Sequence, residues 1–126
     1  MGLLPWSDEF PCIDFTTDAG VVDLHNNARI EQLKITPSAA TLTLVFLYAD
    51  NWREIEVRGR LVELEFGGIR DLNLKLPGDY NSLAALTLEG IVHRTVSSQS
   101  YFDLDMGDIQ CSLAADSLTL RGFDAS

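Results

Sequence analysis

Basic side chains are scarce in this sequence. Nine lysine and arginine residues stand against nineteen aspartate and glutamate residues among 126, which gives a formal net charge of −10 at pH 7. Nucleic acids and anionic membrane surfaces are bound by side chains that neutralise phosphates. The composition therefore argues against nucleic acid and membrane as partners, and it favours a basic protein.

The residues that build disulfide frameworks and zinc sites are also few. The chain has two cysteines, Cys12 and Cys111, and two histidines, His25 and His93. A zinc site needs three or four clustered ligands, so no metal and no cofactor is expected. Cys111 alternates with apolar neighbours, which predicts a buried core thiol. A Cys12–Cys111 disulfide stays open as the alternative.

Long apolar runs are missing as well. No stretch approaches the roughly 18 apolar residues of a membrane-spanning helix. Residues 1–6 lack the basic start and apolar stretch of a signal peptide, so a bacterial, cytoplasmic location is expected. A length of 126 residues is typical of a single domain over 1–126. Within it we expect an irregular, acidic segment over 1–27 and a β core over 28–121.

Period-two alternation of apolar and polar residues dominates the chain. Residues 41–48 are apolar on both faces, which predicts a central strand. The pattern predicts an all-β antiparallel sandwich or flattened barrel of about eight to nine short strands. At most one short helical turn is expected, over 82–86, and Arg58–Gly59 is either a hairpin turn or a bulge. Strands are expected over 28–35, 41–48, 54–57, 61–66, 71–76, 86–94, 101–106, 109–113 and 117–121.

The negative charge lies at the two ends of the sequence. Residues 1–27 hold five acids and no lysine or arginine, and residues 95–126 hold five acids and only Arg121. These acids either line solvated loops and edge strands or form one acidic face, if the ends of the chain come together. Asp103, Asp105 and Asp108 are the acidic surface candidates. Their spacing does not match a helix-flanked calcium loop, because Gly107 falls at position five instead of six.

His25, Asn26, Arg29, Trp6 and Trp52 are the candidates for ligand or partner binding. An imidazole at His25 could act as a base or a ligand, but the structural interpretation is that it hydrogen-bonds backbone where the chain enters the sheet. The two tryptophans either line a ligand groove or cap the ends of the sandwich. No catalytic residue is predicted, since no Gly-x-Ser-x-Gly elbow or phosphate loop occurs.

His93 shares one face of its predicted strand with Thr87, Glu89 and Ile91, so it is expected to be a half-exposed strand residue.

Two blocks of the sequence resemble a group of small all-β bacterial domains. The first is Leu24-His-Asn-Asn-Ala-Arg-Ile30, and the second is Leu64-Glu-Phe-Gly-Gly-Ile-Arg-Asp-Leu72. Most of that group has no assigned function, and some members are similar to predicted immunity proteins of bacterial toxin systems. This sequence has Asn26–Asn27 where the group has a single aspartate, so the resemblance carries over no functional residue.

Three hypotheses of function follow. The first is a non-enzymatic protein-interaction module, such as an acidic inhibitor or immunity-type protein. The second is a small-ligand-binding β domain or an enzyme with a pocket near His25. The third is a structural or assembly subunit that forms a homo-oligomer through an exposed sheet edge.

Overall fold

Antiparallel strands form almost all of the structure. The computed structural model describes residues 14–17, 20–49, 51–76, 87–107 and 109–122. Its strands are β1 (Asp14–Thr17), β2 (Gly20–Asp23), β3 (Ala28–Thr36), β4 (Thr41–Tyr48), β5 (Arg60–Gly67), β6 (Arg70–Lys75), β7 (Gly90–Val96), β8 (Gln99–Met106), β9 (Ile109–Ala115) and β10 (Ser117–Arg121). Short helical turns are η1 (Pro37–Ala39), η2 (Trp52–Glu54) and α1 (Ile55–Arg58).

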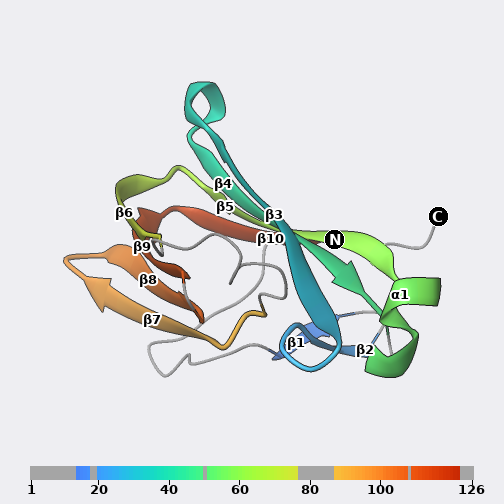
Figure 1. Cartoon of the computed structure of the whole chain (residues 1–126). Coiled ribbons are helices and arrows are strands. Elements are labelled where there is room, and N and C mark those ends of the chain that lie inside the picture. The colour runs from blue at the N-terminus through green and yellow to red at the C-terminus, as the bar shows by residue number, and fades with distance from the viewer. Residues whose placement is uncertain (1–13, 18–19, 50, 77–86, 108, 123–126) are drawn as a thin grey trace.

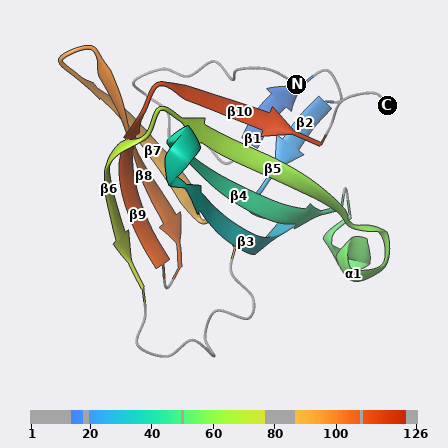
Figure 2. The ribbon, with the colours of Figure 1, turned by 90° about the horizontal axis from the view of Figure 1, so that it is seen from above.

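Two four-stranded sheets form the body of the fold (Figures 1 and 2). The first has the order β10-β5-β4-β3 and the second the order β6-β9-β8-β7, while β1 and β2 pair as a separate hairpin. Every strand pair is antiparallel. The predicted all-β antiparallel sandwich is therefore confirmed. β4 lies between β5 and β3, as its two apolar faces predicted.

The core lies between the inward faces of the two sheets. Phe66 on β5 and Phe102 on β8 meet there edge to face, with ring centroids 5.1 Å apart. This geometry is favourable for aromatic pairs and joins the two sheets directly. Phe46 is also fully buried, and aliphatic side chains and a methionine fill much of the remaining core, among them Leu24, Leu42, Leu44, Leu64, Leu88, Ile91, Leu104, Met106, Leu113, Leu118 and Leu120.

His93 also belongs to this inward face, and the expectation of half exposure was wrong. The residue is 3% exposed and its ring lies 5.0 Å from that of Phe102. Alternation places it on the same side of β7 as Ile91, which is fully buried. The imidazole therefore acts as a core side chain of the second sheet.

The chain crosses between the sheets twice at one corner. β5 leads to β6 through Gly68, and β9 leads to β10 through Asp116, whose backbone N–H donates to the carbonyl of Gly67 at 2.8 Å. Gly68 has a φ of 64°, and a Cβ there would lie 2.3 Å from a carboxylate oxygen of Asp116. Arg70 forms an ion pair with the same carboxylate at 3.0 Å. Glycine at position 68 lets the two crossings lie side by side.

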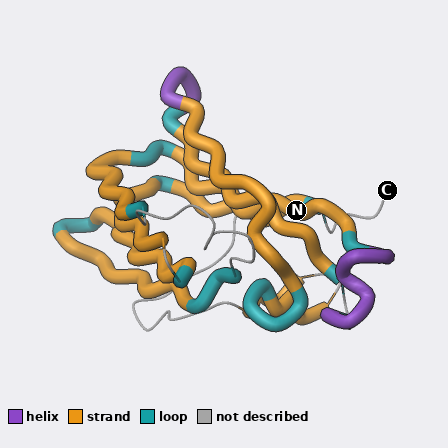
Figure 3. The backbone as a smooth tube through the Cα atoms, in the orientation of Figure 1, coloured by secondary structure: helices purple, strands orange, loops and turns teal. Residues whose placement is uncertain are grey.

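η2 and α1 follow one another directly as two helical turns (Figure 3). The sequence predictions for this segment were wrong in two respects. Residues 54–57 were expected to form a strand, but Glu54 ends η2 and Ile55–Arg58 is α1. Gly59 is neither a hairpin turn nor a bulge, since it links α1 to β5. A Cβ on Gly59 would lie 2.3 Å from the carbonyl oxygen of Ile55 and 2.7 Å from Leu47, so only glycine fits this junction.

The amino-terminal segment is also more regular than expected. Residues 1–27 were predicted to be irregular, but β1 and β2 form a four-pair hairpin within them. The helical turn expected over 82–86 lies outside the described residues.

Candidate functional site

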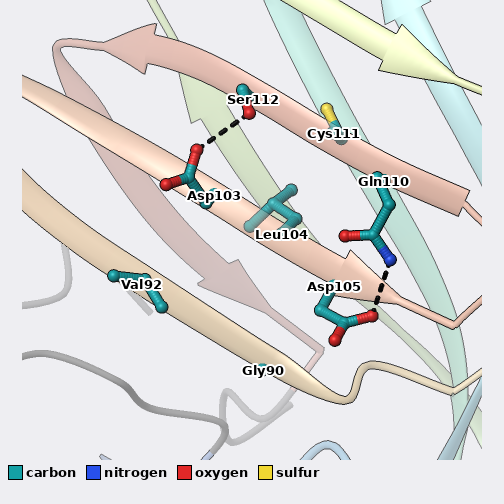
Figure 4. A pocket seen from close by; sticks show the side chains of 8 residues that line it. All are labelled: Gly90, Val92, Asp103, Leu104, Asp105, Gln110, Cys111 and Ser112. Atoms are coloured by element: carbon teal, nitrogen blue, oxygen red, sulfur yellow. Dashed lines mark hydrogen bonds between the residues drawn. The ribbon is translucent and has the colours of Figure 1, made fainter.

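A hollow of about 310 Å³ lies on the outer face of the second sheet, over β7, β8 and β9 (Figure 4). Its two carboxylates come from one strand, and its other polar groups come from the next strand along. Leu104 and Cys111 also line the hollow, and their side chains are buried in the core. The side chains and backbone that line it on the outer face belong to Gly90, Val92, Asp103, Asp105, Gln110 and Ser112.

Strand register explains why these residues meet. β8 and β9 form a hairpin in which Asp103 faces Ser112 and Asp105 faces Gln110. On the other side of β8, Val92 faces Asp103 and Gly90 faces Asp105. Side chains opposite one another in an antiparallel pair lie on the same face of the sheet. The six residues therefore form two rows of three across the strands.

Gln110 and Asp105 orient each other. The side-chain amide nitrogen of Gln110 donates to Asp105 Oδ1 at 2.9 Å and to the carbonyl oxygen of Gly107 at 2.9 Å. Asp105 Oδ1 and the Gly107 carbonyl oxygen only accept hydrogen bonds, so the amide atom that faces them is the nitrogen, which donates. Its carbonyl oxygen is turned the other way, toward Leu104 (Figure 4). The glutamine thus offers an acceptor to the hollow.

Asp105 carries the uncompensated charge of this site. Its Oδ1 also accepts a hydrogen bond from the backbone N–H of Gly107 at 3.0 Å. Within the described part of the chain, no ion pair or hydrogen bond reaches its Oδ2. The carboxylate is held by one oxygen and presents the other.

Asp103 is held and partly neutralised by its neighbours. The hydroxyl of Ser112 donates to its Oδ1 at 2.8 Å, and Nε of Arg94 lies 3.6 Å from its Oδ2. Arg94 itself lies over the ring of Tyr101, 5.5 Å from the centroid. The two carboxylates and one nearby guanidinium leave a local charge of about −1.

Gly90 leaves one wall of the hollow open. A Cβ on this residue would meet no atom of the described residues within 4 Å, and its φ is not in the left-handed region. Neither crowding nor backbone conformation therefore requires glycine here. Gly90 is the first residue of β7 and pairs with Asp105, so its missing side chain leaves the space beside that aspartate unfilled.

His25 lies away from the hollow and fastens the start of β7. Its Nδ1 lies 3.0 Å from the carbonyl oxygen of Leu88, so Nδ1 carries the hydrogen and donates it. This bond joins residues 63 positions apart. The Nδ1 atom is also 3.6 Å from Glu89 Oε2 in a partly exposed pair. The structural interpretation of this histidine, a hydrogen bond to backbone, is confirmed.

The other predicted binding residues do not join the hollow. Asn26 is exposed in the turn before β3. Arg29 on β3 donates from Nε and Nη2 to Oε1 of Glu31 at 3.0 and 2.9 Å. Trp6 and Asp108 lie outside the described residues, and the side chain of Trp52 is not described. Of the predicted candidates, the structure brings together Asp103 and Asp105.

Cys111 is a free, buried thiol. Burial raises its pKa from 9.0 to about 11, and the charge of Asp103 adds to the rise. The thiol is therefore protonated at neutral pH, as expected for a core side chain.

Within residues that the structure describes, no three His, Cys, Asp or Glu side chains lie close enough together to hold a metal ion. Among these same residues, no helix has both the length and the apolar character to cross a membrane.

Comparison with known proteins identifies a shared fold. No family model matches the chain, and no curated protein matches it. A crystal structure of an uncharacterized protein from Neisseria gonorrhoeae is similar, with a TM-score of 0.54 and 18% sequence identity. The similarity covers 78% of this chain and 93% of that chain. It is compatible with the resemblance to small all-β domains of unknown function.

We predict that replacing His25 lowers stability. His25→Ala leaves the Leu88 carbonyl without its donor, which costs about 1–2 kcal/mol of unfolding free energy. His25→Asn retains a donor at a similar position and recovers part of the loss. Chemical denaturation of the three proteins measures the difference, and an alanine variant as stable as the wild type would contradict this role.

Cys111 gives a pH-dependent prediction. The native thiol keeps its proton to about pH 11, whereas the unfolded thiol loses it near its ordinary value of 9.0. Its contribution to stability is therefore fully present below pH 9 and is lost as the pH rises toward 11. Over this range we expect the free energy of unfolding of the wild type to fall by about 1–2 kcal/mol more than that of Cys111→Ala. Solvent screening of the thiol is included in this figure. Denaturant unfolding at pH 8.5, 9.5 and 10.5 measures the difference, and parallel profiles would refute it.

Proposed function

We propose that this protein is a protein-interaction module that binds a basic partner through the outer face of β7, β8 and β9. The observation that carries the proposal is the hollow on this face, where Asp103 and Asp105 share one side of β8. An inhibitor or immunity-type protein that covers a cationic active site would use such a face.

The charge of the whole chain supports the same partner. A net charge of −10 attracts a basic protein over distances of about one Debye length, roughly 8 Å at physiological salt. Complementary charges of this kind raise the association rate more than they strengthen the final complex. A partner bound in this way is released as the salt concentration rises.

The location of the hollow supports this function over a ligand pocket near His25. The Nδ1 hydrogen of His25 is used to hold the Leu88 carbonyl. The hollow contains neither His25, Asn26 nor Arg29. The resemblance to predicted immunity proteins, seen in two blocks of the sequence, supports an inhibitory form of the interaction.

Reversal of the two charges tests the proposal. The wild type and the Asp103→Lys/Asp105→Lys variant are immobilised and exposed to a lysate of the source organism in low salt. We expect the wild type to retain a basic protein that elutes as salt rises. The purified partner should then associate at least ten-fold more slowly with the reversed variant, because two attractive charges become repulsive.

Asp71→Lys is the control, and because it reverses one acid it is compared with the single variant Asp105→Lys. Asp71 is an exposed acid on β6 of the same sheet and lies outside the hollow. Thermal melting shows whether each variant is folded. The proposal is wrong if both lysine variants slow association equally, or if the wild type retains no basic protein.

A further inference from the structure

Resting on the proposed function, we propose that the hollow on β7, β8 and β9 receives a single arginine side chain of the basic partner. The hollow would then be the specific contact within a wider electrostatic interface. Its volume of about 310 Å³ is at the small end of ligand-binding pockets, which is suited to one side chain.

The polar groups that line the hollow are acceptors. Asp105 presents Oδ2, and Gln110 presents its carbonyl oxygen because its nitrogen is fixed on Asp105 and Gly107. The hydrogen of the Ser112 hydroxyl is used by Asp103. A site built in this way is complementary to a group that only donates hydrogen bonds, and arginine and lysine are the side chains of that kind.

A guanidinium fits this arrangement better than an ammonium. Asp103 and Asp105 are two residues apart on one strand, so their Cα atoms are about 7 Å apart and both side chains leave the same face. The five N–H groups of a guanidinium diverge in a plane and reach several acceptors at once, whereas an ammonium is a compact point charge. Val92, which is 49% exposed, offers an apolar wall for the arginine stem.

The local charge matches one cation. Arg94 lies beside Asp103, whereas Asp105 forms no ion pair with a described residue. One added guanidinium therefore neutralises the site without burying an unpaired charge, which would be costly.

Gly90 provides the space. A Cβ at position 90 meets no described atom within 4 Å, so the backbone there has room for a side chain to begin. A β-branched residue would also favour a strand. The glycine is the first residue of β7, and without a side chain it keeps one wall of the hollow open to an approaching side chain.

A titration with a defined probe tests the proposal. The full chain, labelled with ¹⁵N, is titrated in low salt with acetyl-Gly-Arg-Gly-amide and followed by amide NMR spectra. We expect saturable shifts centred on the amides of Gly90, Val92, Asp105 and Gln110. The dissociation constant should be on the order of millimolar, as suits one side chain. The citrulline peptide, which has the same shape without charge, should bind at least ten-fold more weakly.

Three variants separate binding from folding. Gly90→Val fills the hollow and should abolish saturable binding while the melting temperature stays the same or rises. Asp105→Asn removes the charge but keeps the Oδ1 acceptor, and it should weaken binding at least ten-fold. Asp71→Asn removes the same charge elsewhere on the sheet and should bind as the wild type does. Asparagine suits position 71, whose φ is 53°.

The inference fails if the arginine peptide shifts amides over the whole acidic surface without saturation, or if Gly90→Val still binds it. If the peptide titration fails in this way but the wild type still retains a basic partner from the lysate, the proposed function stands and the arginine site is wrong. Saturable arginine binding with no basic partner retained would have the opposite meaning: the site stands and the proposed function fails.

Discussion

The packing of Phe102 against Phe66 is the contact on which the outer face of β8 depends. The two rings join the sheets at a centroid distance of 5.1 Å. Burying each such side chain is worth about 1.5–3 kcal/mol. Because side chains alternate along a strand, a slip of one residue would turn Phe102, Leu104 and Met106 to solvent and bury the aspartates between them. The inward packing therefore determines that Asp103 and Asp105 share the wet face.

The rest of the hollow follows from strand pairing. Once β8 is fixed, its antiparallel register with β9 places Gln110 and Ser112 beside the two aspartates, and its register with β7 adds Gly90 and Val92. His25 contributes from a distance, because its hydrogen bond to Leu88 holds the chain two residues before Gly90. A binding face arises here from side chains that the core does not need, on strands that the core holds in place. In the proposed interaction, the outward side chains bind the basic partner while the inward side chains hold the strands in place.

Much of the fold was predictable because alternation is a local signal. The double-sided apolar run of β4 predicted a central strand, and Pro37 marked the end of β3. Residues 54–57 misled the prediction because two apolar residues alternating with two acids suit one helical turn as well as a short strand. The helical turn is followed by Gly59, which approaches Ile55 and Leu47 too closely for any side chain. His93 was misplaced because polarity alone does not show which face of an edge strand is covered.

The acids of the hollow were predictable, and its other residues were partly so. A two-residue turn at Gly107–Asp108 would have paired Asp105 with Gln110 and Asp103 with Ser112 by counting back from it. A glycine within the strand expected over 86–94 was a further signal. The hollow itself depends on β7 pairing with β8, and pairing partners are not encoded in the period of either strand.

Direct observation of the bound side chain tests the account most closely. Intermolecular nuclear Overhauser effects between an arginine-containing peptide and the ¹³C-labelled protein report which protons lie within a few ångströms of one another. We expect cross-peaks from the arginine side-chain methylenes to the methyl groups of Val92, and none to the exposed methyl groups of Leu61 on the first sheet. Cross-peaks to Leu61 without any to Val92 would contradict the assignment of the hollow as the binding site.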